Sequence, residues 1–524
     1  MAIPYFADIH CHPSMKPFRQ EQETNIFETI EVQPECQKLN IFTRPVARDI
    51  VKESQTNISK CQQGKLRVIL ASIYTPERKF FDLTNLFEFL LDTFAPSQTV
   101  NLGVCMTGFR RSLIEEYVDA HDKNRDKPID HFSETQKEYE YLVRQSEQNK
   151  DFHLVGDYAE LQQILNQSED TVAAIPTIEG MHSLTVFKDF EQQNIPFEAV
   201  NDTTNPYYEH FALQYQINIG RIKQWGNGRH APLFITYTHY FWNLLCGHAK
   251  ALDTPALSQK LALGKGFSQL GKTALHALLS RENGRRILPD IKHMSVQARK
   301  EFFGIWRSYQ QQGDNFPIIC SHTAVTGKAT LNDLADDKDS RNELDNAYFN
   351  TWSINIADEE VHYIHESGGL VGLIFHDERM PGGISQKIIR DAKECGEFQK
   401  MRDEYVRLWM SNALQIVKAV GQASGWDIIC IGSDYDGVMN GFDVYFDVMS
   451  YPDFQNHVIQ YLHRPIVNPY VEGLKTVEEI KALYFGLTPD QIAEKILYKN
   501  VDNFLQRFYH DGYLKNGQVG NIVA

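Results

Sequence analysis

Short apolar runs that end in polar clusters recur along the whole chain. Most of them are too short for buried helices, and they read as nearly continuous hydrophobic segments. Strands of a parallel sheet that is covered on both faces have this pattern. The eight runs are, in order, "IPYFADIHCH", "KLRVILASIY", "TVAAIPTIEG", "PLFITYTHY", "RRILPDIKHMS", "FPIICSH", "GGLVGLIFHD" and "DIICIGSDYDG".

The stretches between these runs are long enough for helices. One of them, "SQLGKTALHALLS", places its apolar residues on one helical face. Near the end, "LTPDQIAEKIL" predicts a helix that begins at Pro489, with Thr488 and Gln491 forming a capping box. Eight alternating strand and helix units predict an α/β protein with a closed (β/α)8 TIM-type barrel. Pro289 in the fifth run cannot donate a sheet hydrogen bond, so we expect a local irregularity there.

The chain is about twice as long as a plain barrel, which needs about 250 residues. Its 524 residues therefore predict a single barrel domain, residues 1–524, with large loop insertions. The longest insertion contains "SETQKEYEYLVRQSEQNK", a charged segment that favours a helix. We place the insertions at about 21–65, 76–170, 327–359 and 437–475.

Composition and charge narrow the classes of partner. Hydrophobic residues make up 42% of the chain and aromatic residues 12%, enough for a sizeable core. The net charge of −16 argues against nucleic acid and against anionic membrane surfaces as partners. No apolar run has the length of a membrane span, and "MAIPYFADIH" has neither a basic n-region nor a signal-peptide h-region. We therefore expect a soluble, cytoplasmic protein that binds no membrane.

The cysteines show no metal-binding or redox spacing. None of the eight forms a CxxC pair, and Cys320 and Cys430 lie inside apolar runs. The sequence therefore predicts buried free thiols in a reducing compartment.

The first apolar run ends in two histidines, His10 and His12, separated by one residue. Side chains at positions i and i+2 of a strand point to the same face, so both imidazoles point into the predicted barrel. They lie at the carboxyl end of the strand, where such barrels build their active sites. Two imidazoles in this arrangement can share a metal ion. The alternative is a chance pair of polar residues at a strand end.

Five further runs end in a residue that can bind metal or move a proton. A barrel would bring all these residues together, whereas a single histidine is more often a structural hydrogen-bonding group. Histidine and carboxylate ligands suit zinc, with manganese, iron or nickel as alternatives. The residues are Glu179, His239, His293, His322 and Asp434.

These motifs resemble the membrane (renal) dipeptidase family of metallopeptidases, within the amidohydrolase superfamily. The similar segments occur in the family's order and span nearly the whole chain. "IEGMHSL" and "GSDYDGV" are the most specific. The others are "ADIHCHP", "FITYTHYFWN", "GFSQLGK", "DIKHMS" and "PIICSHTA".

The resemblance implies a (β/α)8 barrel with two divalent metal ions, usually zinc. By position, His10 and His12 would bind the first ion and Glu179 would bridge both. The second ion would be bound by His293 and His322. The remaining residues would act on the substrate: His239 would hold the scissile carbonyl or the developing oxyanion, and Asp434 would handle the proton of the attacking water and the leaving amine.

The sequence departs from the family pattern at two positions. The family usually has aspartate where this chain has His12, which leaves one negative charge fewer. The family also has an arginine after the sixth strand that grips the substrate carboxylate, whereas Ile354 falls at that position here. We predict Arg341 as its first substitute, because it lies in the insertion that displaces the arginine. Lys328 and Arg379 are alternatives.

Two neighbouring polar residues have open roles. Asp8 shares the face of His10 and His12, so it either orients a ligand imidazole or is a buried group with another partner. His376, at the end of the seventh run, either lines the pocket or is structural.

Three functions remain as hypotheses. The first is a dimetal hydrolase that cleaves the amide bond of dipeptides or similar small substrates by metal-activated hydroxide. The second is a related amidohydrolase acting on N-acyl amino acids, lactones or other esters. The third is a non-catalytic barrel used for binding, against which His239 and Asp434 argue. The oligomeric state is open, with a homodimer as one alternative.

Overall fold

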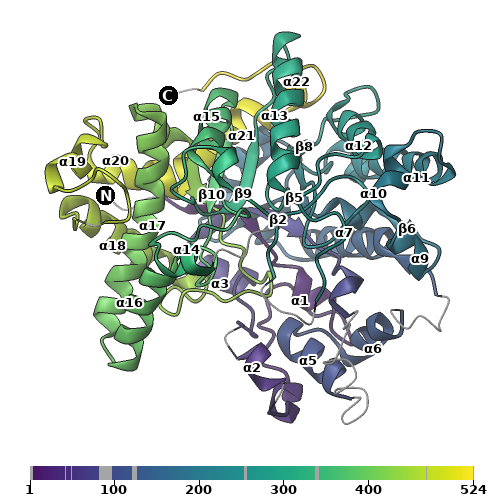
Figure 1. The fold of residues 1–524 in the computed structure, drawn as a ribbon, viewed down its shortest axis with the longest axis horizontal. Helices are drawn as coiled ribbons and strands as arrows, with labels where there is room; N and C mark the ends of the chain where they lie inside the picture. Colours follow the sequence, from purple (N-terminus) through teal and green to yellow (C-terminus); the bar gives the residue numbers. More distant parts are fainter. Residues whose placement is uncertain are drawn as a thin grey trace.

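A computed structural model describes residues 4–522 except 42, 49, 82–96, 121–126, 253–256, 337–340 and 468. Within this part, eight parallel strands close into a barrel that is surrounded by helices (Figure 1). Each of the eight apolar runs supplies one strand, so the predicted (β/α)8 barrel is confirmed. The barrel strands are β1 (Phe6–Cys11), β2 (Leu66–Ile73), β5 (Val172–Glu179), β7 (Phe234–Thr236), β8 (Leu288–Asp290), β9 (Ile319–Thr323), β10 (Leu370–Leu373) and β11 (Ile429–Ile431).

The barrel closes between β2 and β5, which pair in register from Val68↔Ala173 to Ile73↔Ile178. A further short strand, β4 (Phe152–Leu154), pairs with the first half of β5 on its other side. In this way β4 covers the part of β5 that β7 does not reach, because β7 pairs only with the end of β5. The sequence pattern did not predict β4.

Pro289 lies in the middle of β8. The register between β7 and β8 runs without a shift through Phe234↔Leu288, Ile235↔Pro289 and Thr236↔Asp290, so the expected irregularity is absent on this side. On the other side, the pairing with β9 consists of Asp290↔Ile319. A proline is tolerated here because the ladder with β9 is so short.

Helices follow the strands and also fill the inserted segments. The predicted capping box at Thr488 and Gln491 is present at the start of α20. Among the described helices, none is both long and apolar enough to cross a membrane. The helices are α1 (Met15–Phe18), α2 (Arg44–Ala47), α3 (Ile58–Gln63), α5 (Ser97–Thr107), α6 (Arg111–Ala120), α7 (His131–Gln148), α8 (Tyr158–Gln167), α9 (Phe190–Gln193), α10 (Phe197–Asn201), α11 (Pro206–Lys223), α12 (Gln269–Leu279), α13 (Val296–Gln311), α14 (Arg341–Asp345), α15 (Asp358–Ser367), α16 (Gly383–Glu394), α17 (Phe398–Val420), α18 (Tyr451–His463), α19 (Val477–Ala482), α20 (Pro489–Glu494), α21 (Asn500–Phe508) and α22 (Asp511–Leu514). A two-stranded antiparallel ribbon is formed by β3 (Ile129–Asp130) and β6 (Val186–Phe187).

A disulfide joins two of the predicted insertions. Cys36, in the short helix η1 (Pro34–Lys38), is bonded to Cys105 in α5. The prediction that all cysteines are free thiols is therefore wrong for this pair. The other six are free, and of these only Cys395 is exposed. A disulfide is typical of oxidising compartments, so it speaks against the reducing compartment expected from the sequence.

Candidate metal centre

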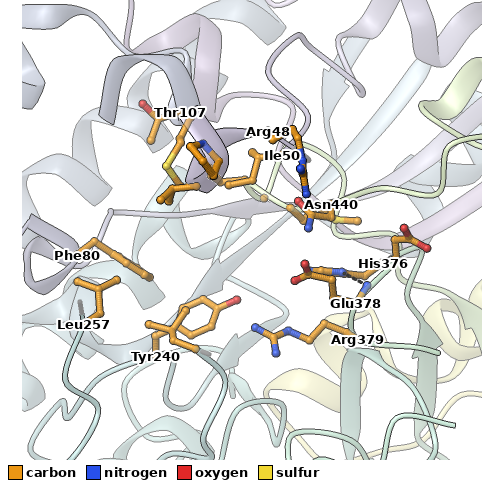
Figure 2. A pocket seen from close by; sticks show the side chains of 18 of the residues that line it. Arg48, Ile50, Phe80, Thr107, Tyr240, Leu257, His376, Glu378, Arg379 and Asn440 are labelled. Carbon is orange, nitrogen blue, oxygen red and sulfur yellow. Dashed lines mark hydrogen bonds between the residues drawn. The ribbon is translucent and has the colours of Figure 1, made fainter. Parts of the chain in front are cut away.

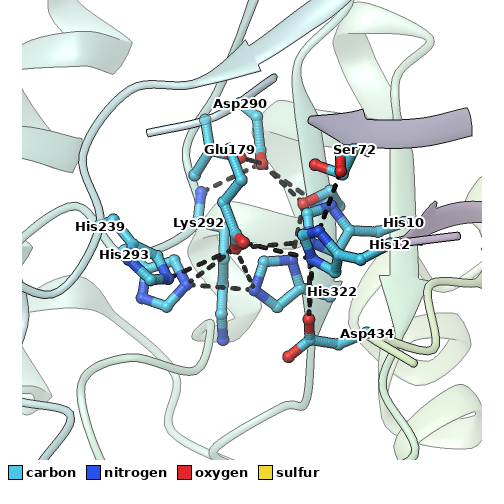
Figure 3. A network of polar contacts seen from close by, with 12 residues as sticks. His10, His12, Ser72, Glu179, His239, Asp290, Lys292, His293, His322 and Asp434 are labelled. Atoms are coloured by element: carbon cyan, nitrogen blue, oxygen red, sulfur yellow. Dashed lines mark hydrogen bonds and ion pairs between the residues drawn. The ribbon is translucent and has the colours of Figure 1, made fainter. Parts of the chain in front are cut away.

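The residues predicted from the strand ends meet at one end of the barrel (Figure 3). They lie at the carboxyl ends of six different strands, on the last residues or in the loops that follow. All of them are buried, with at most 9% of a residue exposed. These residues are His10 and His12 at the end of β1, Glu179 on β5, His239 after β7, His293 after β8, His322 on β9 and Asp434 after β11. In the barrel, adjacent strands bring together residues that lie hundreds of positions apart in the sequence.

Their ligand-type atoms form two groups that share one carboxylate. His10, Glu179, His322 and Asp434 each offer one atom, and these atoms lie within 4.8 Å of one another. Glu179, His239 and His293 form a second group with the same spacing. Glu179 belongs to both groups, so one carboxylate is shared between them.

The remaining histidine ligand predicted from the sequence, His12, lies at the edge of the first group. Its Nε2 is 3.3 Å from Glu179 Oε2 and 3.5 Å from Asp434 Oδ1. His322 lies between the two groups, because its Nε2 is only 3.1 Å from the Nε2 of His293. The five predicted ligands are thus close together. His322 belongs to the group of His10 and also contacts His293 of the second group.

Several buried ring nitrogens at this centre lack a hydrogen-bond partner. Among the described residues, three of these nitrogens make no hydrogen bond. They are both ring nitrogens of His10 and Nε2 of His12. A buried polar atom without a partner costs about 1–3 kcal/mol, so such atoms point to a missing ligand. A set of imidazole and carboxylate donors fits zinc, and also manganese, iron or nickel. The residues present therefore fit a divalent metal centre.

The electrostatics of the centre favour neutral His293 and His322 next to an ionised Glu179. Burial lowers the pKa of His293 and His322 well below the usual value, and the charges of His239 and His10 add to this effect. Burial would raise the pKa of Glu179, but the imidazoles of His239 and His10 hold it well below its usual value. Neutral imidazole and ionised carboxylate are the forms that bind metal.

His12 differs from His293 and His322. Burial opposes its charged form, but the nearby carboxylates of Asp434 and Glu179 outweigh burial and raise the pKa of His12 to about 10. Its Nδ1 lies 2.9 Å from the carbonyl oxygen of Ser72, which fixes the orientation of the ring. In this orientation, Nε2 points toward the two carboxylates.

Glu77 is a buried acidic residue that the sequence analysis missed. Its Oε2 lies 2.6 Å from Nδ1 of His239, and its carboxylate also accepts hydrogen bonds from the backbone N–H groups of Tyr240 and Phe241. Burial opposes the charge of His239, but Glu179 and Glu77 together raise its pKa. Glu77 follows the second apolar run, so a polar residue after a predicted strand was the available signal.

Asp290 is a second buried acidic residue that the sequence analysis missed, and it supports His322 through Ser321. Asp290, at the end of β8, accepts hydrogen bonds from the hydroxyls of Thr236, at 2.7 Å, and Ser321, at 2.6 Å. The Ser321 hydroxyl also lies 2.9 Å from Nδ1 of His322. This chain of contacts holds the imidazole from its far side.

Among the described residues, Asp8 makes no hydrogen bond or ion pair with an imidazole ring. Its carboxylate accepts hydrogen bonds from the backbone N–H groups of His10 and Ser433, and from the Tyr451 hydroxyl at 2.7 Å. Of the two alternatives, the structure therefore supports the buried group with another partner. Through these backbone contacts, Asp8 ties the end of β1 to the loop that carries Asp434.

Two residues of the centre have unusual backbone conformations. His293 has φ of 66° and Asp434 has φ of 62°, in the left-handed region that few residues other than glycine adopt. Such conformations cost about 1–3 kcal/mol each and persist where the surroundings impose them, often at functional sites. The loops after β8 and β11 therefore hold these two side chains in the centre at a cost in stability.

The centre opens into a large cavity. The cavity has a volume of about 1530 Å³, and Glu179 and His239 form part of its lining. Figure 2 shows other lining side chains, among them Phe80, Tyr240 and Arg379. His376 also lines it, and its Nδ1 accepts a hydrogen bond from the backbone of Glu378, so both of its expected roles apply.

The position of the family's arginine is filled by apolar packing. Ile354 is 3% exposed and belongs to a small hydrophobic cluster with Ala249 and Ala251. Of its predicted substitutes, Lys328 is ion-paired with Glu343. Arg341 begins α14, but its side chain lies outside the described part of the structure, so its role stays a prediction.

Comparison with known proteins gives matches by structure only. No family model matches the chain, and no curated protein matches its sequence. The chain resembles solved dipeptidases and metallopeptidases. A metallopeptidase of family M19, dipeptidase AC, is 12% identical with a TM-score of 0.46, and the match covers 97% of this chain and 99% of that one.

Two further structures are similar over nearly their whole length. A metallopeptidase from Rhodobacter sphaeroides, solved with a phosphinate mimic of the dipeptide L-Ala-D-Ala, is 11% identical with a TM-score of 0.46, covering 97% of this chain and 99% of that one. The probable dipeptidase PvdM from Pseudomonas aeruginosa is 13% identical with a TM-score of 0.43, covering 95% and 94%.

Proposed function

We propose that the protein is a metal-dependent hydrolase that cleaves the amide bond of dipeptides or similar small substrates. The observation that carries this proposal is the pair of donor groups that share Glu179 at the carboxyl ends of the barrel strands. This is the end where barrels of this type build active sites. Five ligands with one bridging carboxylate suit two divalent ions, of which zinc fits the donor set best.

His10, His12, Glu179, His293 and His322 would hold these ions. Bound there, the ions would supply Lewis acidity and lower the pKa of water at the centre. The chain's own residues would supply the remaining steps, which are orientation of the substrate and transfer of a proton.

His239 would donate a hydrogen bond to the scissile carbonyl oxygen. Glu77 accepts from Nδ1 of the ring, so Nε2 faces the centre, where it lies 3.6 Å from Glu179 Oε1. The charge of Glu77 also favours the protonated ring, which stabilises an oxyanion better than a neutral donor does.

Asp434 would accept the proton of the attacking water and deliver it to the leaving nitrogen. Its Oδ1 lies 3.7 Å from Nε2 of His10 and 3.5 Å from Nε2 of His12. A carboxylate beside the ligands is within reach of any water held there. A barrel used only for binding would have no need of this residue, or of the buried Glu77–His239 pair.

Metal content tests the proposal. Protein expressed in metal-replete medium and purified gently should hold about two divalent ions per chain. The Glu179→Gln variant should lose both together, because the shared carboxylate loses its charge. Glu378→Gln, which changes a carboxylate that lines the same cavity, is the matched control and should keep both ions.

Elemental analysis of the three proteins gives the answer. Absence of metal from the parent protein would sink the hydrolase proposal. If Glu179→Gln retains two tightly bound ions, Glu179 is not the bridge.

A related amidohydrolase activity, on N-acyl amino acids, lactones or other esters, is the second candidate. The apolar packing around Ile354 leaves the family's carboxylate site without its arginine, which favours the substrates of this group that have no free carboxylate, the lactones and other esters. Assays of dipeptides beside N-acyl amino acids and lactones separate the two candidates.

A further inference from the structure

The cavity above the metal centre is larger than a dipeptide requires. Its volume of about 1530 Å³ exceeds the range of about 300–1,000 Å³ that is usual for small-molecule pockets. Much of its lining is apolar and comes from the predicted insertions rather than from the barrel strands. The apolar lining residues include Ile50, Phe80, Leu102, Met106, Leu257 and Val438.

Arg379 places a buried cation on this lining. The residue is 8% exposed, its guanidinium carbon lies 5.0 Å from the centre of the Trp352 ring, and it donates a hydrogen bond to the carbonyl oxygen of Ala251. Among the described residues, no carboxylate forms an ion pair with it, and this includes Glu378, the next residue in the chain. A guanidinium with this little exposure is stable when an anion completes its hydrogen bonds.

Tyr240 connects Arg379 with the metal centre. Its ring centroid lies 4.2 Å from that of His239 and 5.0 Å from that of His293. Figure 2 shows the Arg379 side chain pointing toward the Tyr240 hydroxyl. An anion bound to Arg379 would therefore lie beside the centre.

The apolar wall also begins next to the centre. The ring of Phe80 packs against that of Tyr240, with centroids 5.4 Å apart. Figure 2 shows Leu257 beside Phe80. From there the lining continues to Met106 on α5, the helix that is tied to η1 by the disulfide. Charged and apolar parts of the lining thus flank the same reaction site.

We propose that the substrate is an N-acyl amino acid or a dipeptide with a large apolar N-terminal group. Its carboxylate binds Arg379, and its apolar group lies against Phe80, Met106 and Leu257. The inference rests on the proposed hydrolase function and names the substrate class for that site. Hydrolysis consumes one water and releases the apolar carboxylic acid and the free amino acid.

Three substrates that share the same scissile amide test the two halves of the proposal, the charged half at Arg379 and the apolar half at Phe80, Met106 and Leu257. N-decanoylalanine carries both features, N-acetylalanine lacks the long chain, and N-decanoylalanine amide lacks the charge. For the metal-loaded parent enzyme, kcat/KM for N-decanoylalanine should exceed that for N-acetylalanine by about tenfold or more, since each buried methylene adds binding energy.

Arg379→Gln tests the charged half. It should lower kcat/KM for N-decanoylalanine by about ten- to a hundredfold, the usual effect of losing a charge-assisted hydrogen bond, and change the amidated substrate by less than about threefold. Arg390→Gln, another arginine of the cavity lining, is the matched control and should change neither.

Met106→Trp and Leu257→Trp test the apolar half from two different segments. Each should fill the apolar space and lower kcat/KM for N-decanoylalanine by about tenfold, with N-acetylalanine little changed. A binding measurement supports the kinetics. Calorimetry with N-decanoylalanine and the metal-loaded Asp434→Asn variant should show a Kd that Arg379→Gln weakens by the same factor.

The outcomes separate this inference from the proposed function. If the enzyme hydrolyses dipeptides but treats decanoyl and acetyl substrates alike, the apolar half is overturned and the hydrolase stands. If Arg379→Gln affects charged and amidated substrates equally, the charged half is overturned. If the metal-loaded enzyme hydrolyses neither dipeptides nor the N-acyl substrates, the proposed function itself fails.

Discussion

Asp434 combines a left-handed backbone with a side chain that faces two ligand imidazoles. We predict that Asp434→Asn lowers turnover by about a hundredfold or more, because the amide cannot accept a proton. Asparagine keeps the shape and one oxygen, and it tolerates the same backbone conformation. Metal content should therefore stay near that of the parent, and steady-state kinetics with elemental analysis measure both quantities.

Asp443→Asn is the control for this variant, because Asp443 also lines the cavity but pairs with Lys393. It should leave turnover unchanged. Near-normal turnover of Asp434→Asn would mean that another residue moves the proton.

The residues of the centre differ in how readily they can be predicted from the sequence. His10, His12 and Asp434 could be predicted because each lies at or just after the end of an apolar run, so position alone places them at the mouth of the barrel. Glu77 was missed because "TPERK" also reads as an ordinary charged loop. Asp290 was missed because its role depends on Ser321, which only the folded barrel brings near it.

At the scale of elements, Asp314 joins two segments around β8. It lies between α13 and β9, and its carboxylate forms ion pairs with Arg281 after α12 and with Arg286 before β8. Arg286 is 1% exposed, so its guanidinium depends on this partner. Burial would raise the pKa of Asp314, but the two arginines lower it below the usual value.

We predict that Asp314→Asn reduces the free energy of unfolding by about 1–3 kcal/mol at pH 7, because a buried arginine loses its ionised partner. The unfolded carboxyl group has a pKa of about 3.9 and the folded one a lower pKa. The stabilisation is therefore complete above the unfolded pKa and is lost as the pH falls through the folded pKa. The difference between parent and variant should shrink correspondingly.

Urea unfolding followed by circular dichroism, at pH 7 and at lower pH, measures this difference. Glu282→Gln is the control, since Glu282 is exposed in the same region and forms no ion pair with a described residue. A constant difference across this pH range would mean that the Asp314 ion pairs do not cause the effect.

The elements of the barrel were predictable, and those of the insertions largely were not. Each barrel strand is an apolar run buried on both faces, which the sequence displays directly. The three residues of β4 are too short for such a pattern, and their pairing depends on the space that β7 leaves beside β5. α12 and α20 could be placed because their apolar periodicity or capping residues are local signals.

At the scale of the whole molecule, the disulfide between Cys36 and Cys105 closes a loop across 69 positions. We predict that the double variant Cys36→Ser, Cys105→Ser is less stable by up to about 4 kcal/mol, because the unfolded chain gains the freedom of that loop. Thermal unfolding of the variant measures the loss. Cys395→Ser, which removes the exposed free thiol, is the control.

Mass spectrometry tests the bond itself. Alkylation of the denatured protein without reduction should label six thiols, and eight after reduction. Eight labelled thiols without reduction would contradict the disulfide. The pairing could not be read from the sequence because its two cysteines lie in separate insertions, and only the tertiary arrangement brings them together.

The bond has a consequence for the connectivity of the molecule. The ring that it closes contains all of β2, a strand that pairs with both β1 and β5. Every residue between Cys36 and Cys105 is therefore joined to the rest of the chain by two covalent routes. A single cut of the backbone inside this ring would leave one molecule of unchanged mass apart from the added water, and only reduction as well would divide it in two.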